Sequence, residues 1–93
     1  MNARMLTRNI MIAKRRTTVR LEAAVWDALD DICSNEGVTR HELCTRIDQA
    51  RGEANRAQAV RATVINYFRL ALKPSFKTRI IDQALLGVDN QTS

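Results

Sequence analysis

Six consecutive residues near the N-terminus alternate between two chemical types. Arg16, Thr18 and Arg20 carry hydrogen-bond donors and two positive charges, whereas the residues that alternate with them are apolar or β-branched: Thr17, Val19 and Leu21. A guanidinium group can bind a phosphate or a guanine edge through two hydrogen bonds, and a hydroxyl can donate or accept. The alternation predicts a β-strand with one covered face and one face that can contact nucleic acid. A merely solvated strand face is the alternative interpretation.

Positive charge is concentrated beside this strand. The 93 residues carry a formal net charge of +5, and residues 1–20 contain six basic residues and no acidic one. The next segment is the opposite, because residues 21–38 contain five acidic residues and no basic one. This separation predicts that the strand faces an anionic partner and that the acidic segment points away from it.

Residues 1–13 are predicted to be a basic N-terminal arm. Two interpretations stay open for it: contact with a phosphate backbone, or a solvated and disordered leader. The apolar run at residues 10–13 is too short for a signal peptide or a membrane span, so we expect a soluble, cytoplasmic protein with no membrane partner. Anchoring of the arm to an anionic membrane surface is a weaker hypothesis, because too few of its residues are apolar.

Helical periodicity follows the strand. Val25, Leu29 and Ile32 recur at helical spacing and predict a helix over about 23–36, which Gly37 ends with a left-handed cap. Thr39 and a glutamate three residues later form a capping box, so a second helix is expected to begin at once, with an apolar stripe of Leu43, Cys44, Ile47 and Ala50.

A third helix is predicted from an N-cap at Asn55 to about Leu72, before Pro74. Its inward residues are expected to be Val60, Val64, Tyr67, Phe68 and Ala71. Beyond the proline, apolar residues between 76 and 85 suggest a short fourth helix. This stripe could pack on its own domain or dock another protein, and we expect the former.

The sequence shows no hairpin turn beside the strand at 16–21 and no second strand. Because an isolated strand leaves its backbone groups unpaired, its expected partner is the same strand of a second copy, antiparallel about a two-fold axis. The expected fold is therefore mainly α with one short β-strand per chain. Two copies would form an intertwined homodimer with a two-stranded intermolecular ribbon, which fits the DNA major groove.

The chain resembles the ribbon-helix-helix superfamily of Arc and MetJ, and within it a bacterial subgroup. The resemblance rests on the strand from Lys14 to Leu21, on Trp26 to Asp30, and on Gly37-Val38-Thr39 opening a helix. It implies base contacts from Arg16, Thr18 and Arg20. It also implies phosphate contacts at the start of the second helix, where free backbone N–H groups lie, from Thr39, Arg40 and His41. Lys14 and Arg15 are expected to touch phosphates as well.

The predicted organisation is an arm over 1–13, a ribbon-helix-helix domain with an extra third helix over 14–72, and an extension over 73–93. The predicted function is a sequence-specific transcriptional regulator, expected to be a repressor, associated with the nucleoid. An antitoxin or adaptor that binds a protein through residues 75–86 is the alternative. No enzyme is expected, since there is one histidine and no phosphate-binding loop.

No cofactor and no metal are expected either. Cys33 and Cys44 lack the C-x-x-C spacing of zinc sites, and both fall beside apolar helical positions. We therefore predict that they are small buried thiols.

Overall fold

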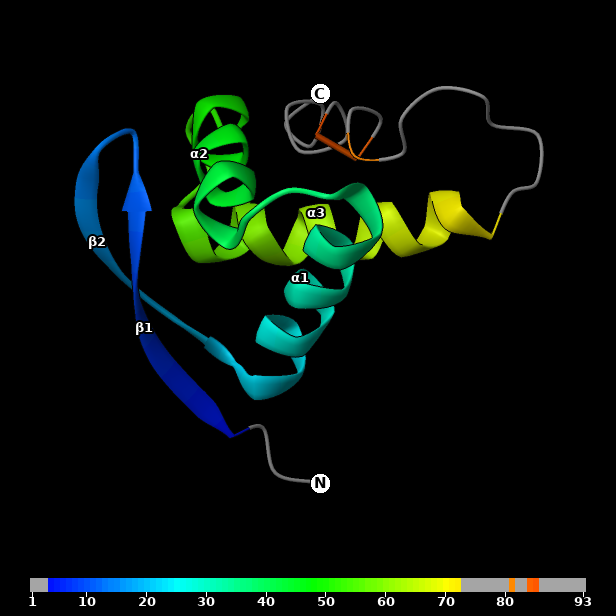
Figure 1. The fold of residues 1–93 in the computed structure, drawn as a ribbon, viewed down its shortest axis with the longest axis horizontal. Coiled ribbons are helices and arrows are strands. Elements are labelled where there is room, and N and C mark those ends of the chain that lie inside the picture. The colour runs from blue at the N-terminus through cyan, green and yellow to red at the C-terminus, as the bar shows by residue number, and fades with distance from the viewer. Residues whose placement is uncertain (1–3, 73–80, 82–83, 86–93) are drawn as a thin grey trace.

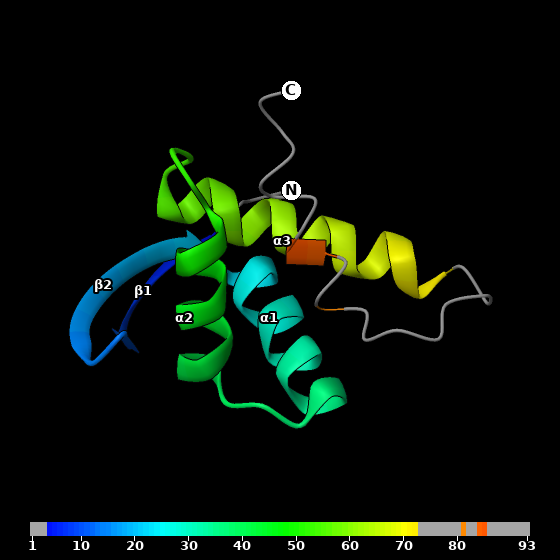
Figure 2. The ribbon, with the colours of Figure 1, turned by 90° about the horizontal axis from the view of Figure 1, so that it is seen from above.

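The computed structural model describes residues 4–72 together with Ile81, Ala84 and Leu85. A two-stranded sheet is followed by three helices: β1 (Met5–Ile12), β2 (Arg15–Glu22), α1 (Ala23–Glu36), α2 (Arg40–Ala50) and α3 (Arg56–Ala71). All three helices lie on the same side of the sheet (Figures 1 and 2), so its other face is left uncovered by them. No helix among the described residues is both long and apolar enough to cross a bilayer.

The predicted lone strand is wrong, because β2 has an antiparallel partner in its own chain. The partner is β1, which pairs from Met5 opposite Glu22 to Ile12 opposite Arg15. The segment 1–13, expected to be an arm and open to disorder, therefore contains a strand. A tight turn of Ala13 and Lys14 joins the strands, with φ of 50° and 68° at these residues. Such left-handed turns usually contain Asn-Gly or Asp-Gly, so Ala-Lys gives no recognisable hairpin signal.

The turn is a site of backbone strain, which a substitution can relieve. A left-handed conformation costs a residue other than Gly, Asn or Asp about 1–2 kcal/mol. We therefore expect the double change Ala13→Asn and Lys14→Gly to raise the free energy of unfolding by about 1 kcal/mol. Urea denaturation measures this shift. The matched control, Ala13→Val, introduces a β-branched residue at the same φ and should lower stability instead. Equal stability of both variants would contradict the assigned turn.

The first helix has the predicted bounds and the predicted end. Gly37 adopts the left-handed conformation with φ of 69°, and its N–H and that of Val38 both donate to the carbonyl of Cys33. At the other end, Glu22 provides no side-chain cap. The N-terminus of α1 depends instead on a hydrogen bond from the N–H of Ala23 to the carbonyl of Arg4, 2.7 Å, which extends the hairpin pairing into the helix.

The two later helices begin at their predicted caps. Thr39 accepts from the N–H of Glu42 and the Glu42 carboxylate accepts from the N–H of Thr39, both at 3.0 Å, which confirms the capping box. These bonds also lower the pKa of the Glu42 carboxyl. Asn55 caps α3 by accepting from the N–H of Gln58 at 2.8 Å. Both caps are local interactions, which explains why the sequence alone located them.

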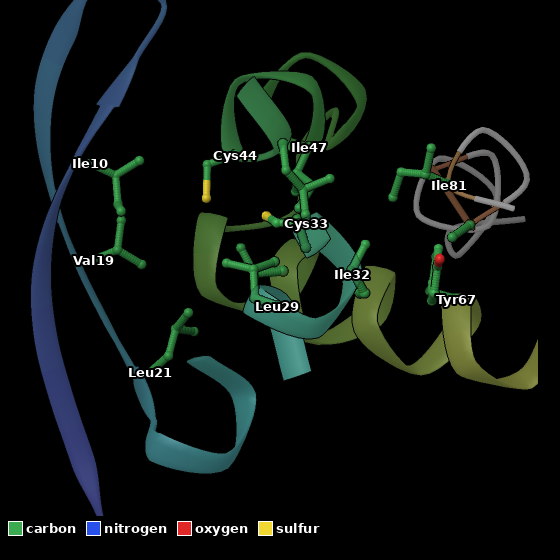
Figure 3. Packing of buried hydrophobic residues seen from close by; sticks show 14 of the residues in the cluster. Ile10, Val19, Leu21, Leu29, Ile32, Cys33, Cys44, Ile47, Tyr67 and Ile81 are labelled. Carbon is green, nitrogen blue, oxygen red and sulfur yellow. The ribbon is translucent and has the colours of Figure 1, made fainter. Parts of the chain in front are cut away.

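The core lies between the inner face of the hairpin and the helices (Figure 3). Its largest fully buried side chains include Trp26, Leu29, Ile32, Leu43 and Ile47, together with Ile10 and Leu21 from the two strands. Both cysteines are free and buried, as predicted. Burial raises the pKa of the Cys44 thiol to about 12, so this thiol is protonated and unreactive at neutral pH.

The predicted inward face of α3 is only partly correct. Val60 and Tyr67 are buried, but Phe68 is 40% exposed, and Ala71 is also exposed. Thr63 takes a buried position instead, and its hydroxyl donates to the carbonyl of Ala59 at 2.8 Å. A small threonine can occupy the helix interface because this bond satisfies its hydroxyl.

The predicted fourth helix lies largely outside the described residues. The three that are described, Ile81, Ala84 and Leu85, are helical and belong to the buried core cluster. The amide of Asn66 donates to the carbonyl of Ala84 at 3.3 Å, and Figure 3 shows Ile81 beside Tyr67. These contacts agree with packing of the stripe on its own domain.

Candidate nucleic-acid interface

The outer face of the hairpin carries two parallel rows of side chains. In β2 these are the predicted residues Arg16, Thr18 and Arg20, all exposed, while Val19 and Leu21 on the opposite face are buried. The predicted alternation of faces is therefore confirmed. Directly opposite lie three exposed residues of β1: Met11, Asn9 and Thr7, respectively.

The β1 row was missed in the sequence, although a signal for it exists. Residues 5–12 alternate as β2 does, with Leu6, Ile10 and Ile12 toward the core. Arg8 interrupts this inward series, so the period-two pattern is not clean. In the structure Arg8 is exposed, and its guanidinium lies 5.6 Å from the centroid of the Trp26 ring, a cation–π arrangement that accommodates a charge on the helix-facing side.

The outer edge of β1 is closed at its C-terminal end by α2. The N–H of Met11 donates to Nδ1 of His41 at 2.9 Å, and the N–H of Ala13 donates to the hydroxyl of Thr45 at 3.2 Å. His41 and Thr45 lie one helical turn apart on α2, and Met11 and Ala13 lie two residues apart along the chain. The two distances are similar, so both acceptors can face both N–H groups. The helix therefore blocks further strand pairing at this end of β1.

The open edge belongs to β2. Because the N–H of Met11 points to α2, its pairing with Arg16 is of the kind without mutual hydrogen bonds, and antiparallel alternation extends this to Thr18 and Arg20. Their backbone groups therefore point away from β1. Within the described part of the chain, no helix or loop backbone bonds to them. An open pocket of about 460 Å³ borders this edge and is lined by Ile12, Ala13, Arg15, Arg16, Thr17, Thr18, Asp48 and Arg56.

The basic residues of β2 and of the turn are electrostatically unpaired in the described structure. None of the ion pairs found among residues 4–72 involves Lys14, Arg15, Arg16 or Arg20. The acidic Asp48 in the pocket is bound by Arg51 at 2.8 Å and Arg56 at 2.7 Å, so it does not neutralise them. These arginines also hold the pKa of the Asp48 carboxyl below its usual value, despite its desolvation.

The three residues predicted to contact phosphate at the start of α2 use their side chains for bonds within the protein. Arg40 forms a bidentate pair with Asp30, with nitrogen–oxygen distances of 2.8–3.0 Å, and its guanidinium lies 5.4 Å from the centroid of the Trp26 ring. His41 binds the β1 edge and Thr39 caps the helix. A phosphate at this position would therefore meet the first-turn N–H groups of Arg40 and His41, which have no intrahelical acceptor.

The acidic helix lies behind the hairpin, as its charge predicted. Asp27 and Asp31 of α1 are exposed, whereas the other acidic residues of the segment have partners. Asp30 binds Arg40, and Glu36 accepts from the Tyr67 hydroxyl at 2.8 Å. Glu22 binds Arg61 at 2.9 Å, which holds the pKa of its carboxyl below the usual value. The separation of a basic face and an acidic helix is thus maintained in three dimensions.

These features define a class: a small protein with an exposed basic β-hairpin whose other face is covered by three helices. The family model described as a ribbon-helix-helix domain matches residues 5–68. This chain therefore belongs to the ribbon-helix-helix family, as the sequence resemblance indicated. Members of this family are in general DNA-binding regulators and typically not enzymes. No curated protein and no solved structure matches the chain.

Proposed function

We propose that this protein is a sequence-specific DNA-binding regulator that represses transcription as a homodimer. The observation that carries the proposal is the exposed row of Arg16, Thr18 and Arg20 on the uncovered face of the hairpin, without acidic partners among the described residues. In the major groove, arginine can donate two hydrogen bonds to guanine, and threonine can bond base edges or contact a thymine methyl group.

Phosphate contacts fix the position of the ribbon in the groove. We assign this role to Lys14 in the exposed turn and to Arg15 directly after it. We also assign it to the first-turn amides of Arg40 and His41, which follow the N-cap Thr39, whose own N–H is bound by Glu42. The hydrogen bond from Met11 to His41 joins the start of α2 to the end of β1, so one DNA strand could contact both regions. Such contacts orient the protein but do not distinguish sequences.

Dimerisation is proposed through the open edge of β2. Pairing of β2 with its copy about a two-fold axis would satisfy the outward backbone groups of Arg16, Thr18 and Arg20 and form the intermolecular ribbon typical of the family. Because each β2 already pairs with β1, the ribbon would be the centre of a four-stranded sheet. The dimer proposal thus rests on the family and on this edge, no longer on a strand without a partner.

The competing hypothesis of an adaptor with a protein-binding segment at residues 75–86 receives no support. The described residues of that segment are buried in the core and so unavailable to a partner: Ile81, Ala84 and Leu85. We propose that the protein acts on bacterial nucleoid DNA in the cytoplasm.

Selection from a random pool of double-stranded DNA tests the proposal. The full-length protein should enrich a short sequence repeated as two half-sites, and sedimentation should give twice the monomer mass. Placed upstream of a reporter promoter, the selected site should lower expression when the protein is present. A pool that stays random, with equal affinity for all sequences, would overturn the proposal of specific binding. A monomer on a single unrepeated site would overturn the dimer.

A further inference from the structure

One hydrogen bond links the two rows of the outer face. The hydroxyl of Thr18 donates to Oδ1 of Asn9 at 3.0 Å, across the pair of residues that are directly opposite in β2 and β1. Both side chains are exposed. Opposite residues in an antiparallel pair have Cβ atoms about 4.5–5.5 Å apart, so the Asn9 amide must lean toward β2 to make this bond.

The bond fixes which groups the two side chains can offer. The hydroxyl proton of Thr18 is used, so this oxygen can only accept from a base. The Asn9 amide retains both N–H donors and a second lone pair on Oδ1. This set of donor and acceptor matches the N7 acceptor and the N6 amino donor of adenine, which asparagine binds in a bidentate manner.

The spacing of strands singles out Asn9 among the β1 residues. In a four-stranded sheet the two β1 strands are three strand spacings apart, about 14 Å, while the major groove is about 12 Å wide. A β1 side chain that points straight outward therefore faces the groove wall. A side chain that leans toward β2 instead reaches inward to the base edges. Of the described β1 residues on the outer face, Asn9 is the one bonded to a β2 side chain.

We propose that Asn9 is a specificity-determining residue that contacts an adenine in each half-site, positioned by Thr18. This inference rests on the proposed function. A base contact from β1 would thereby join those of the β2 row. The element that contacts DNA would then be the whole hairpin.

The test compares Asn9→Ala with Thr7→Ala, a change on the same strand and face at a residue without a bond to a β2 side chain. Each base pair of the selected site is replaced in turn, and dissociation constants are measured for every replacement. Asn9→Ala should remove a preference for adenine of roughly five- to a hundredfold at one position of each half-site, and leave other positions unchanged. Thr7→Ala should keep the complete wild-type profile.

A third variant tests the positioning role of Thr18. Thr18→Val removes the donor to Asn9 but retains the size of the side chain, so it should weaken the same adenine preference in addition to any change at the base that Thr18 itself contacts. Thr18→Ser should retain the adenine preference, and an adenine preference that survives Thr18→Val would overturn the positioning role. Equal weakening of all sequences by Asn9→Ala would identify a phosphate contact and overturn the inference. An unchanged profile would overturn it as well. If wild-type protein shows no sequence preference, the proposed function itself fails, and the two failures are thereby distinguished.

Discussion

A variant with Arg16, Thr18 and Arg20 all changed to alanine is expected to lose sequence-specific DNA binding and to keep its fold. Each bidentate contact from arginine to guanine contributes about 1–3 kcal/mol of discrimination. Two such contacts per chain correspond to a loss of roughly thirtyfold or more in affinity for the selected site. All three side chains are exposed and none supports the core, so the thermal unfolding midpoint should change little.

Two controls separate base contacts from general charge. Arg69→Ala removes one positive charge from an exposed position at the end of α3, and should leave the sequence preference intact. Arg20→Lys keeps the charge but loses the planar pair of donors, so it should lower discrimination more than nonspecific binding. Competition titrations with specific and random DNA measure both quantities. Wild-type discrimination in the triple variant would exclude the hairpin as the element that contacts bases.

The sequence predicted the elements that depend on local chemistry. The faces of β2, the left-handed cap at Gly37 and the capping box at Thr39 each involve residues within a few positions of one another. The composition also separated the basic strand from the acidic helix. These signals located the candidate interface because its residues are consecutive along one strand.

Interactions between distant residues were not predictable. The contacts of Arg40 with Asp30 and of His41 with Met11 join segments 10 and 30 residues apart, so nothing local indicates that these side chains have structural partners. The hairpin failed for a different reason. Its turn residues, Ala13 and Lys14, adopt the left-handed conformation against their intrinsic preference, and pairing along the two strands compensates.

The intrachain hairpin changes the physical basis of the expected dimer. A lone strand would require a second copy merely to satisfy its backbone, whereas β2 already has one satisfied edge. The core of the described residues is also closed within one chain, with Trp26, Leu29 and Leu43 fully buried. Dimerisation is therefore not needed to form this core, and we infer that folding of the chain and the proposed dimerisation are separable steps.

The largest expected effect on stability is at Trp26, where the hairpin and two helices meet. Its side chain is fully buried, Nε1 donates to the carbonyl of Leu6 at 2.9 Å, and the guanidinium groups of Arg8 and Arg40 lie within 6 Å of the ring centroid. Trp26→Ala is expected to cost about 3–5 kcal/mol, a large share of the stability of a small domain. Because α1 would also lose its bond to β1, DNA binding should decline in parallel.

Trp26→Phe is the matched control, since it keeps an aromatic ring in the core and removes the donor to Leu6. Its expected cost is about 1–3 kcal/mol, from the loss of this hydrogen bond and a smaller ring. Trp26 is the single tryptophan of the chain, so unfolding in urea must be followed by circular dichroism rather than by fluorescence. The midpoints should fall in the order wild type, Trp26→Phe, Trp26→Ala. Similar midpoints for the two variants would assign the stabilisation to the hydrogen bond, and an unchanged midpoint for Trp26→Ala would contradict the role of this residue as the anchor of the hairpin.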